Sequence, residues 1–137
     1  MKLKEIIKKI EAERSSKVIV YFTSDRPNLG EMIVEDIIEV FHDILVDIDH
    51  SDKIDLIIYS RGGQTIVPLP LVKLIRKFCD KFSVLVPFRA HSAATMIALG
   101  ADDIYMTKLA ELGPVDPQIG FSKQNGAIRI AAVDVFA

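Results

Sequence analysis

Patterns typical of buried strands and of helices alternate along this chain, and this alternation restricts its fold more than any other feature. Short, almost wholly apolar segments rich in β-branched and aromatic residues predict strands at residues 17–23, 54–59, 82–86 and 104–106. Apolar residues at helical spacing, first-turn prolines and small residues predict helices near the N-terminus and at residues 31–46, 68–79 and 92–99. Apolar strands that alternate with helices form parallel sheets covered on their faces. We therefore predict an α/β fold with right-handed crossovers.

The length of the chain fits one domain, residues 1–137, because domains usually have about 100–200 residues and no linker or internal repeat interrupts it. Half of the residues are hydrophobic, which excludes disorder and requires much apolar surface to be buried. The chain ends in the apolar run IRIAAVDVFA without a helix-ending Gly or Pro. Two explanations stay open: a C-terminal part is missing, or a partner surface covers this end.

Charge and cysteine content exclude several classes of protein. The 17 basic and 19 acidic residues give a net charge of −2, without the basic cluster that nucleic-acid binding needs. The longest stretch without Asp, Glu, Lys or Arg is residues 90–101, well short of the about 20 residues of a membrane-spanning helix. The single cysteine, Cys79, cannot form an internal disulfide, which is typical of a reducing compartment. We expect a cytoplasmic protein with no membrane span in this chain and no nucleic-acid partner.

Ser92 stands at the predicted junction between the third strand and the helix after it. A serine at a tight strand-to-helix turn presents its hydroxyl to solvent beside the free N–H groups of the helix. Such a turn needs small neighbours, and Ala90, Ala93 and Ala94 provide them, although the G-x-S-x-G pattern is absent. In the alternative interpretation, Ser92 or His91 only caps the helix.

Gly62 and Gly63 follow the second predicted strand. Paired glycines let the backbone approach a ligand closely and point an N–H group at it, whereas the alternative is a plain turn with a glycine at positive φ. Donors on this turn and at the start of the helix, together with one serine, supply the nucleophile and oxyanion hole that acyl transfer requires. The two junctions together predict a candidate active site.

The segment VPFRAHSAATMIALGADDIYM, followed by ELGPVDPQIG, resembles the serine dehydrogenase proteinase family. This family is a distant relative of the Clp protease proteolytic subunit and of signal peptide peptidase A within the ClpP/crotonase superfamily, and the resemblance covers residues 17–120. It implies a ClpP/crotonase-like spiral of ββα units with a mostly parallel sheet. It also implies that Ser92 is the nucleophile. The oxyanion donors would be Gly63, with Gly62 shaping the turn, and Ala93.

The chain departs from the family pattern around both junctions. Arg61 stands where the family has Pro before the glycines, and His91 stands where it has Met before the serine. Ala93 and Ala94 replace the two glycines after the serine. Asp102, which matches an acidic residue of the family, is expected to be structural, as a cap or in an ion pair.

The general base stays open at the level of the sequence. The position of the histidine in Clp-type enzymes falls on Asp116–Pro117, and no histidine follows His91. Adjacent residues at a helix start point about 100° apart, so His91 is poorly placed to serve Ser92, and a cap or pocket-wall role is the alternative. A Ser-Lys dyad, as in signal peptide peptidase A, would use Lys123. In the alternative interpretation, Lys123 is an ordinary solvated lysine on the surface. Asp116 would orient a base or accept the proton itself.

No metal or cofactor is expected. Asp47, Asp49 and Asp52 lack the Gly and the closing Glu of a calcium loop, and the three histidines lack the spacing of a zinc site. Neither G-x-G-x-x-G nor G-x-x-x-x-G-K-[ST] occurs, so no nucleotide cofactor is implied.

Together, the residues and the resemblance favour a ClpP-like serine endopeptidase that hydrolyses peptides or unfolded proteins, bound as a strand beside Gly63. A catalytically inactive ClpP-like scaffold or oligomerisation module is the alternative. A crotonase-like acyl-CoA enzyme is a third interpretation, and no adenine-binding signal supports it. The apolar excess and the resemblance predict a homo-oligomer.

Overall fold

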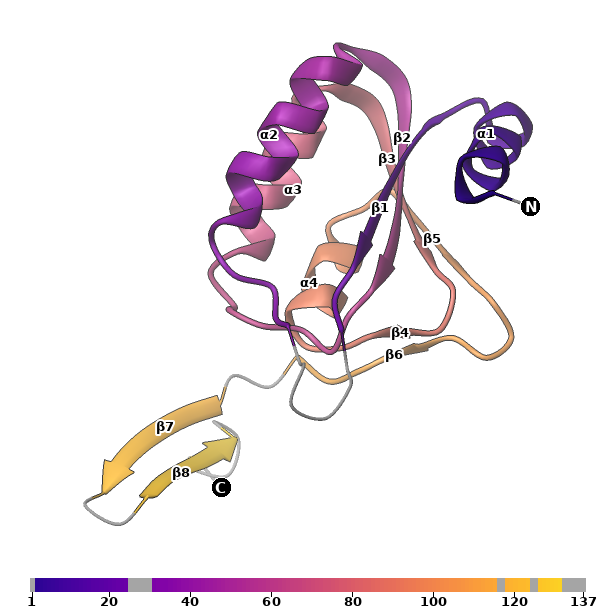
Figure 1. Ribbon diagram of the computed structural model, residues 1–137. Helices are drawn as coiled ribbons and strands as arrows, with labels where there is room; N and C mark the ends of the chain where they lie inside the picture. Colours follow the sequence, from indigo (N-terminus) through magenta and orange to yellow (C-terminus); the bar gives the residue numbers. More distant parts are fainter. Residues whose placement is uncertain (1, 25–30, 116–117, 124–125, 132–137) are drawn as a thin grey trace.

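A four-stranded sheet organises the fold in the computed structural model, which describes residues 2–24, 31–115, 118–123 and 126–131. Its strand order is β1-β2-β3-β5, and every neighbouring pair is parallel (Figure 1). The strands are β1 Lys17–Phe22, β2 Ser51–Tyr59, β3 Cys79–Val86 and β5 Asp103–Met106. All four overlap the predicted apolar segments, although β2 and β3 each begin three residues earlier than predicted and the helix predicted for residues 68–79 ends before Cys79. The predicted α/β fold with a mostly parallel sheet is confirmed.

Helices lie on both sides of the sheet. In Figure 1, α2, α3 and α4 lie on one side and α1 lies on the other. Their bounds are α1 Leu3–Arg14, α2 Ile37–Ile48, α3 Pro68–Arg76 and α4 Ala93–Leu99. Because α1 covers only part of its side, Val20 and Phe22 on β1 stay 36% and 56% exposed.

The helix predicted for residues 31–46 begins six residues later than expected, at Ile37. The reason is a tertiary contact: Ile33 is fully buried and forms a parallel bridge with Gly63. Its apolar side chain fitted the helical period, but its backbone pairs with a distant turn instead, which the local pattern does not encode.

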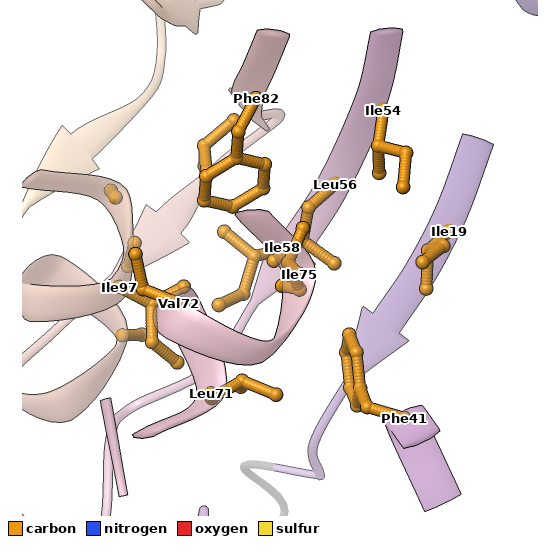
Figure 2. Close-up of a cluster of buried hydrophobic side chains, with 14 of the residues drawn as sticks. Ile19, Phe41, Ile54, Leu56, Ile58, Leu71, Val72, Ile75, Phe82 and Ile97 are labelled. Atoms are coloured by element: carbon orange, nitrogen blue, oxygen red, sulfur yellow. The ribbon is translucent and has the colours of Figure 1, made fainter. Parts of the chain in front are cut away.

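The core lies between the sheet and the helices α2, α3 and α4. Ile54, Leu56 and Ile58 are alternate residues of β2, fully buried on the face toward these helices, as expected for the two-residue period of a strand (Figure 2). Phe82 of β3 and Leu71 of α3 belong to the same cluster. The large buried aliphatic area fixes the register of β2 and therefore the place at which the strand ends.

On the opposite face of the sheet, α1 is tied down by a buried carboxylate. Asp55 of β2 is fully buried, and it accepts hydrogen bonds from the guanidinium of Arg14 (3.2 Å) and from the hydroxyl of Ser16 (2.7 Å). Burial raises the pKa of Asp55, but the hydrogen bonds from Arg14 and Ser16 and the positive charges nearby outweigh it, so its pKa lies below the usual range.

A second, two-stranded sheet leads into α4. β4 Arg89–Ala90 pairs in parallel with β6 Glu111–Leu112, and a bridge from Ser60 to Ala90 joins this sheet to the end of β2. The antiparallel pair of β7 Gln118–Lys123 and β8 Gly126–Ala131 follows in the chain. In the described part of the chain, no helix has the length and apolar character needed to cross a membrane.

Candidate functional site

Ser92 lies between β4 and α4 in a backbone conformation that serine rarely adopts. Its φ is +51° and its ψ is −118°, and such left-handed or neighbouring conformations cost a non-glycine residue roughly 1–3 kcal/mol. Backbone hydrogen bonds hold it there: the Ser92 N–H donates to the Pro114 carbonyl (3.2 Å), and the Met96 N–H donates to the Ser92 carbonyl (3.1 Å). A strained serine at a strand-to-helix turn matches the conformation of a nucleophile elbow.

The Ser92 hydroxyl does not cap α4. Ser92 occupies the N-cap position, but its side chain makes no capping hydrogen bond. Ser92 is half-buried, and its hydroxyl has no hydrogen-bond partner among the residues that the structure describes. Ser92 thus occupies the N-cap position without the capping hydrogen bond that the alternative interpretation expects.

The Gly62–Gly63 turn lies directly against Ser92. Gly62 has a φ of +105°, and a Cβ atom placed on it would lie 2.7 Å from the Cβ of Ser92 and 3.1 Å from the amide nitrogen of Ala93. The same atom would lie 2.7 Å from the His91 carbonyl oxygen. Only glycine fits a positive φ at such a close approach, so the two junctions predicted from the sequence meet in space.

Gly63 is held in the turn by the bridge to Ile33. The Ile33 N–H donates to the Gly62 carbonyl (2.9 Å), and the Gln64 N–H donates to the Ile33 carbonyl (2.8 Å). In this parallel pattern the neighbours of Gly63 bond to Ile33, so the N–H and C=O of Gly63 itself point away from Ile33. A Cβ atom on Gly63 would lie 2.1 Å from the Ile33 carbonyl oxygen, which excludes any side chain.

Two backbone donors are left over where the turn and the helix meet. Among the described residues, neither the Gly63 N–H nor the Ala93 N–H has a hydrogen-bond acceptor. Unpaired N–H groups are uncommon away from solvent, and a pair of them beside a serine hydroxyl can stabilise a negatively charged oxygen. The structure thus brings together Ser92, Ala93, Gly62 and Gly63, the residues predicted for the nucleophile and the oxyanion hole.

His91 is turned toward β6. Its Nε2 lies 3.0 Å from Oε1 of Glu111, and the Arg89 guanidinium donates to the same oxygen (3.0 Å). The ring packs over Gly113, where an added Cβ would lie 2.5 Å from His91 Cδ2. Hydrogen bonds from Arg89 and then His91 lower the pKa of Glu111, which favours the ionised carboxylate. The pocket-wall role weighed for His91 fits this contact better than a base serving Ser92.

Asp102 has the structural contacts expected of it. Its carboxylate accepts a hydrogen bond from the Phe82 N–H (2.8 Å) and forms an ion pair with Arg76 (2.9 Å). The hydrogen bond from Phe82 and the one from Arg76 lower the pKa of Asp102. These contacts join the segment after α4 to β3 and to the end of α3, at the end of α4 opposite Ser92.

The structure does not describe the side chains of the two candidate bases, Asp116 and Lys123. Asp116 lies outside the described residues, and Lys123 lies in β7, of which only the backbone is described. In the part of the chain that the structure describes, no three His, Cys, Asp or Glu side chains are grouped so as to hold a metal ion.

Sequence reasoning missed Ser60 and Thr23. Both are buried, and the Thr23 hydroxyl donates to Ser60 Oγ (2.8 Å), which also accepts from the Gly62 N–H (3.0 Å). For Ser60 the available signal was a hydroxyl residue at the end of an apolar strand, two residues before Gly62.

The chain is similar to one protein family and to two curated proteins. The family model described as ClpP-like SDH-type serine proteinase matches residues 1–133. An uncharacterized protein of Methanocaldococcus jannaschii is 33% identical over 127 residues, which cover 88% of this chain and 43% of that protein. A second uncharacterized protein of the same organism is 45% identical over 71 residues, which cover 51% of this chain and 25% of that protein. The chain therefore spans less than half the length of the curated relatives it matches.

Proposed function

The chain belongs to the family of ClpP-like SDH-type serine proteinases, and on that premise we propose that it is a serine endopeptidase whose nucleophile is Ser92. The observation that carries the proposal is the close contact of the Gly62–Gly63 turn with the Ser92–Ala93 junction. The N–H groups of Gly63 and Ala93, which have no acceptor among the described residues, belong to the two segments that meet at this contact, and the half-buried Ser92 lies in one of them. Acyl transfer needs this combination of groups.

In the proposed reaction, Ser92 Oγ attacks a peptide carbonyl carbon, and the carbonyl oxygen takes up negative charge. The N–H groups of Gly63 and Ala93 donate to this oxygen, and a single donor of this kind contributes about 10²–10³ in rate. The C–N bond then breaks, the proton from Ser92 leaves with the amine through a general base, and water hydrolyses the acyl-enzyme. Asp116 and Lys123 are the proposed candidates for handling this proton.

The substrate that fits best is an extended peptide or an unfolded polypeptide. The N–H and C=O of Gly63 point away from Ile33, so the turn offers a strand-like edge on the side opposite that bridge. An extended segment can add to such an edge through main-chain hydrogen bonds. The homo-oligomeric state and the cytoplasmic location expected from the sequence remain predictions.

The experiment that tests the proposal is labelling with a fluorophosphonate, which reacts with activated serines. We expect mass spectrometry of the labelled chain to find the adduct on Ser92 and to find none in Ser92→Ala. Hydrolysis of casein or a peptide library should be lost in the same variant. A folded wild-type protein that takes up no label on Ser92 would contradict the proposal.

A catalytically inactive scaffold is the second candidate, and one observation favours it. No side chain in the described part of the chain accepts a hydrogen bond from the Ser92 hydroxyl, as an activating base would. Wild-type protein that is unlabelled and forms a stable assembly in light scattering would support the scaffold. Stabilisation by acyl-CoA thioesters would instead support the crotonase-like interpretation.

A further inference from the structure

A chain of buried hydroxyl groups connects the end of β1 to the glycine turn. Ser60 is 1% exposed and Thr23 is 6% exposed. The Thr23 hydroxyl donates to Ser60 Oγ at 2.8 Å, and the Gly62 N–H donates to the same oxygen at 3.0 Å. Buried hydroxyl groups are usually hydrogen-bonded, and in this pair Ser60 Oγ accepts a hydrogen bond from the backbone of the glycine turn.

The hydrogen bond from Gly62 to Ser60 fixes one of the two peptide planes that flank Gly62. The other plane contains the Gly62 carbonyl, which accepts from the Ile33 N–H at 2.9 Å. Because a trans peptide places C=O and N–H on opposite sides, this second plane also sets the direction of the Gly63 N–H. The bond from Ile33 therefore orients the plane that carries the Gly63 N–H, and the bond to Ser60 holds the preceding plane, to which the first is joined through Gly62.

The backbone of Ser60 holds the other half of the site at the same time. The Ser60 N–H donates to the Arg89 carbonyl (3.1 Å), and the His91 N–H donates to the Ser60 carbonyl (3.0 Å). These two bonds position the segment that enters Ser92. The side chain of one residue thus orients the turn, while its backbone orients the nucleophile.

We propose that Ser60, anchored by Thr23, is a positioning residue that aims the Gly63 N–H at the oxygen of the reacting carbonyl. This inference rests on the proposed function of Ser92. Replacement of Ser60 by Ala leaves both backbone bonds to the 89–91 segment intact, so the variant separates orientation of the turn from register of the strands.

The test compares the fluorophosphonate kinetics of folded variants of the full chain. Ser60→Ala should lower the maximal rate of Ser92 labelling by about 10–100-fold. This is somewhat less than the loss of a whole oxyanion donor, because Ile33 still holds the peptide plane that carries the Gly63 N–H. The reagent concentration at half-maximal rate should change little, because the donor acts mainly in the transition state. A merely structural role would not produce this split.

Two further comparisons make the test specific. Ser83→Ala is the matched control, because Ser83 is also fully buried in the sheet but its hydroxyl has no hydrogen-bond partner in the described part of the chain, and its labelling rate should match the wild type. Thr23→Val should slow labelling, whereas Thr23→Ser, which keeps the hydroxyl, should not. The effects of Thr23→Val and Ser60→Ala should be less than additive, because both break the same hydrogen-bonded chain.

Amide hydrogen exchange separates a failure of this inference from a failure of the proposed function. Exchange of the Gly62 amide should be at least about tenfold faster in Ser60→Ala than in wild type and unchanged in Ser83→Ala. A labelled wild type with equally fast labelling of Ser60→Ala would refute the positioning role alone, as would an unchanged Gly62 exchange rate. A wild type unlabelled on Ser92 would refute the proposed function and the catalytic consequence of Ser60 with it.

Discussion

Replacement of Gly62 by Ala tests the contact on which the candidate site depends. The backbone of Gly62 has a φ of +105°, which costs an L-residue with a side chain roughly 1–2 kcal/mol. The new methyl group would also lie 2.7 Å from the His91 carbonyl oxygen and 2.7 Å from the Cβ of Ser92. Since neither neighbour is the flexible end of a side chain, the backbone must shift, and overpacking of this kind adds about 1–3 kcal/mol.

We therefore expect Gly62→Ala to lower the free energy of unfolding by about 3 kcal/mol. For a chain of this length, that loss lowers Tm by roughly 10 °C in a thermal scan followed by circular dichroism. The Ser92 turn should move by some tenths of an ångström to about 1 Å, and a displacement of 1 Å can cost about 100-fold in rate. Labelling of Ser92, measured well below Tm, should fall by up to that factor.

Gly100→Ala is the matched control for this prediction. An added Cβ there would also lie 2.7 Å from a neighbouring atom, but that atom is Cγ2 of Val72, in the packing between α4 and α3. The φ of Gly100 is −78°, so its backbone is unstrained. We expect a lower Tm with unchanged labelling of Ser92. Wild-type Tm and wild-type labelling in Gly62→Ala would refute the argument from contact, and an equal loss of labelling in Gly100→Ala would show that labelling follows global stability.

Two further predictions concern the ion pair under α1 and the strain at Ser92. Arg14→Ala should lower the free energy of unfolding at pH 7 by about 3 kcal/mol in urea titrations, because it leaves the buried Asp55 carboxylate without its main partner. Arg76→Ala is the control: it breaks an exposed ion pair with Asp102 and should lower the free energy of unfolding by at most about 1 kcal/mol. The pKa of Asp55 is lower in the folded protein than its unfolded value of about 3.9. The stability that the ionised Asp55 contributes is therefore complete well above pH 4 and is lost as the pH falls through the folded pKa. Equal acid sensitivity of wild type and Arg14→Ala would contradict this role of the Arg14–Asp55 pair. Ser92→Gly should unfold with a free energy about 1 kcal/mol higher than Ser92→Ala, because glycine adopts the left-handed conformation without strain. Equal stability of these two variants would mean that the turn at Ser92 is not strained.

The sheet was predictable because its strands are continuous apolar segments with β-branched residues, as in Ile54–Tyr59. The start of α2 was not, because the position of Ile33 depends on a bridge to Gly63 that lies far away in the sequence. A periodic pattern reports which side chains are buried, and it does not report whether the backbone bonds to its own helix or to another segment.

The contact between the turn and the serine was predictable for a topological reason: chemistry gathers where parallel strands end. The role of Ser60 was not, because residue type alone does not show that a serine is 1% exposed and accepts two hydrogen bonds. The orientation of His91 toward Glu111 was equally hidden, since the two residues meet only through the pairing of β4 with β6.

The small sheet also determines how well α4 is fixed. The Thr95 hydroxyl donates to the carbonyls of Ala90 (2.6 Å) and Gly113 (2.9 Å), and the Ser92 N–H donates to Pro114. A helix of only seven residues is thereby held near its start by β4 and by the segment that follows β6. A displacement of residues 113–115 would therefore be transmitted to Ser92 and to the start of α4 through these bonds.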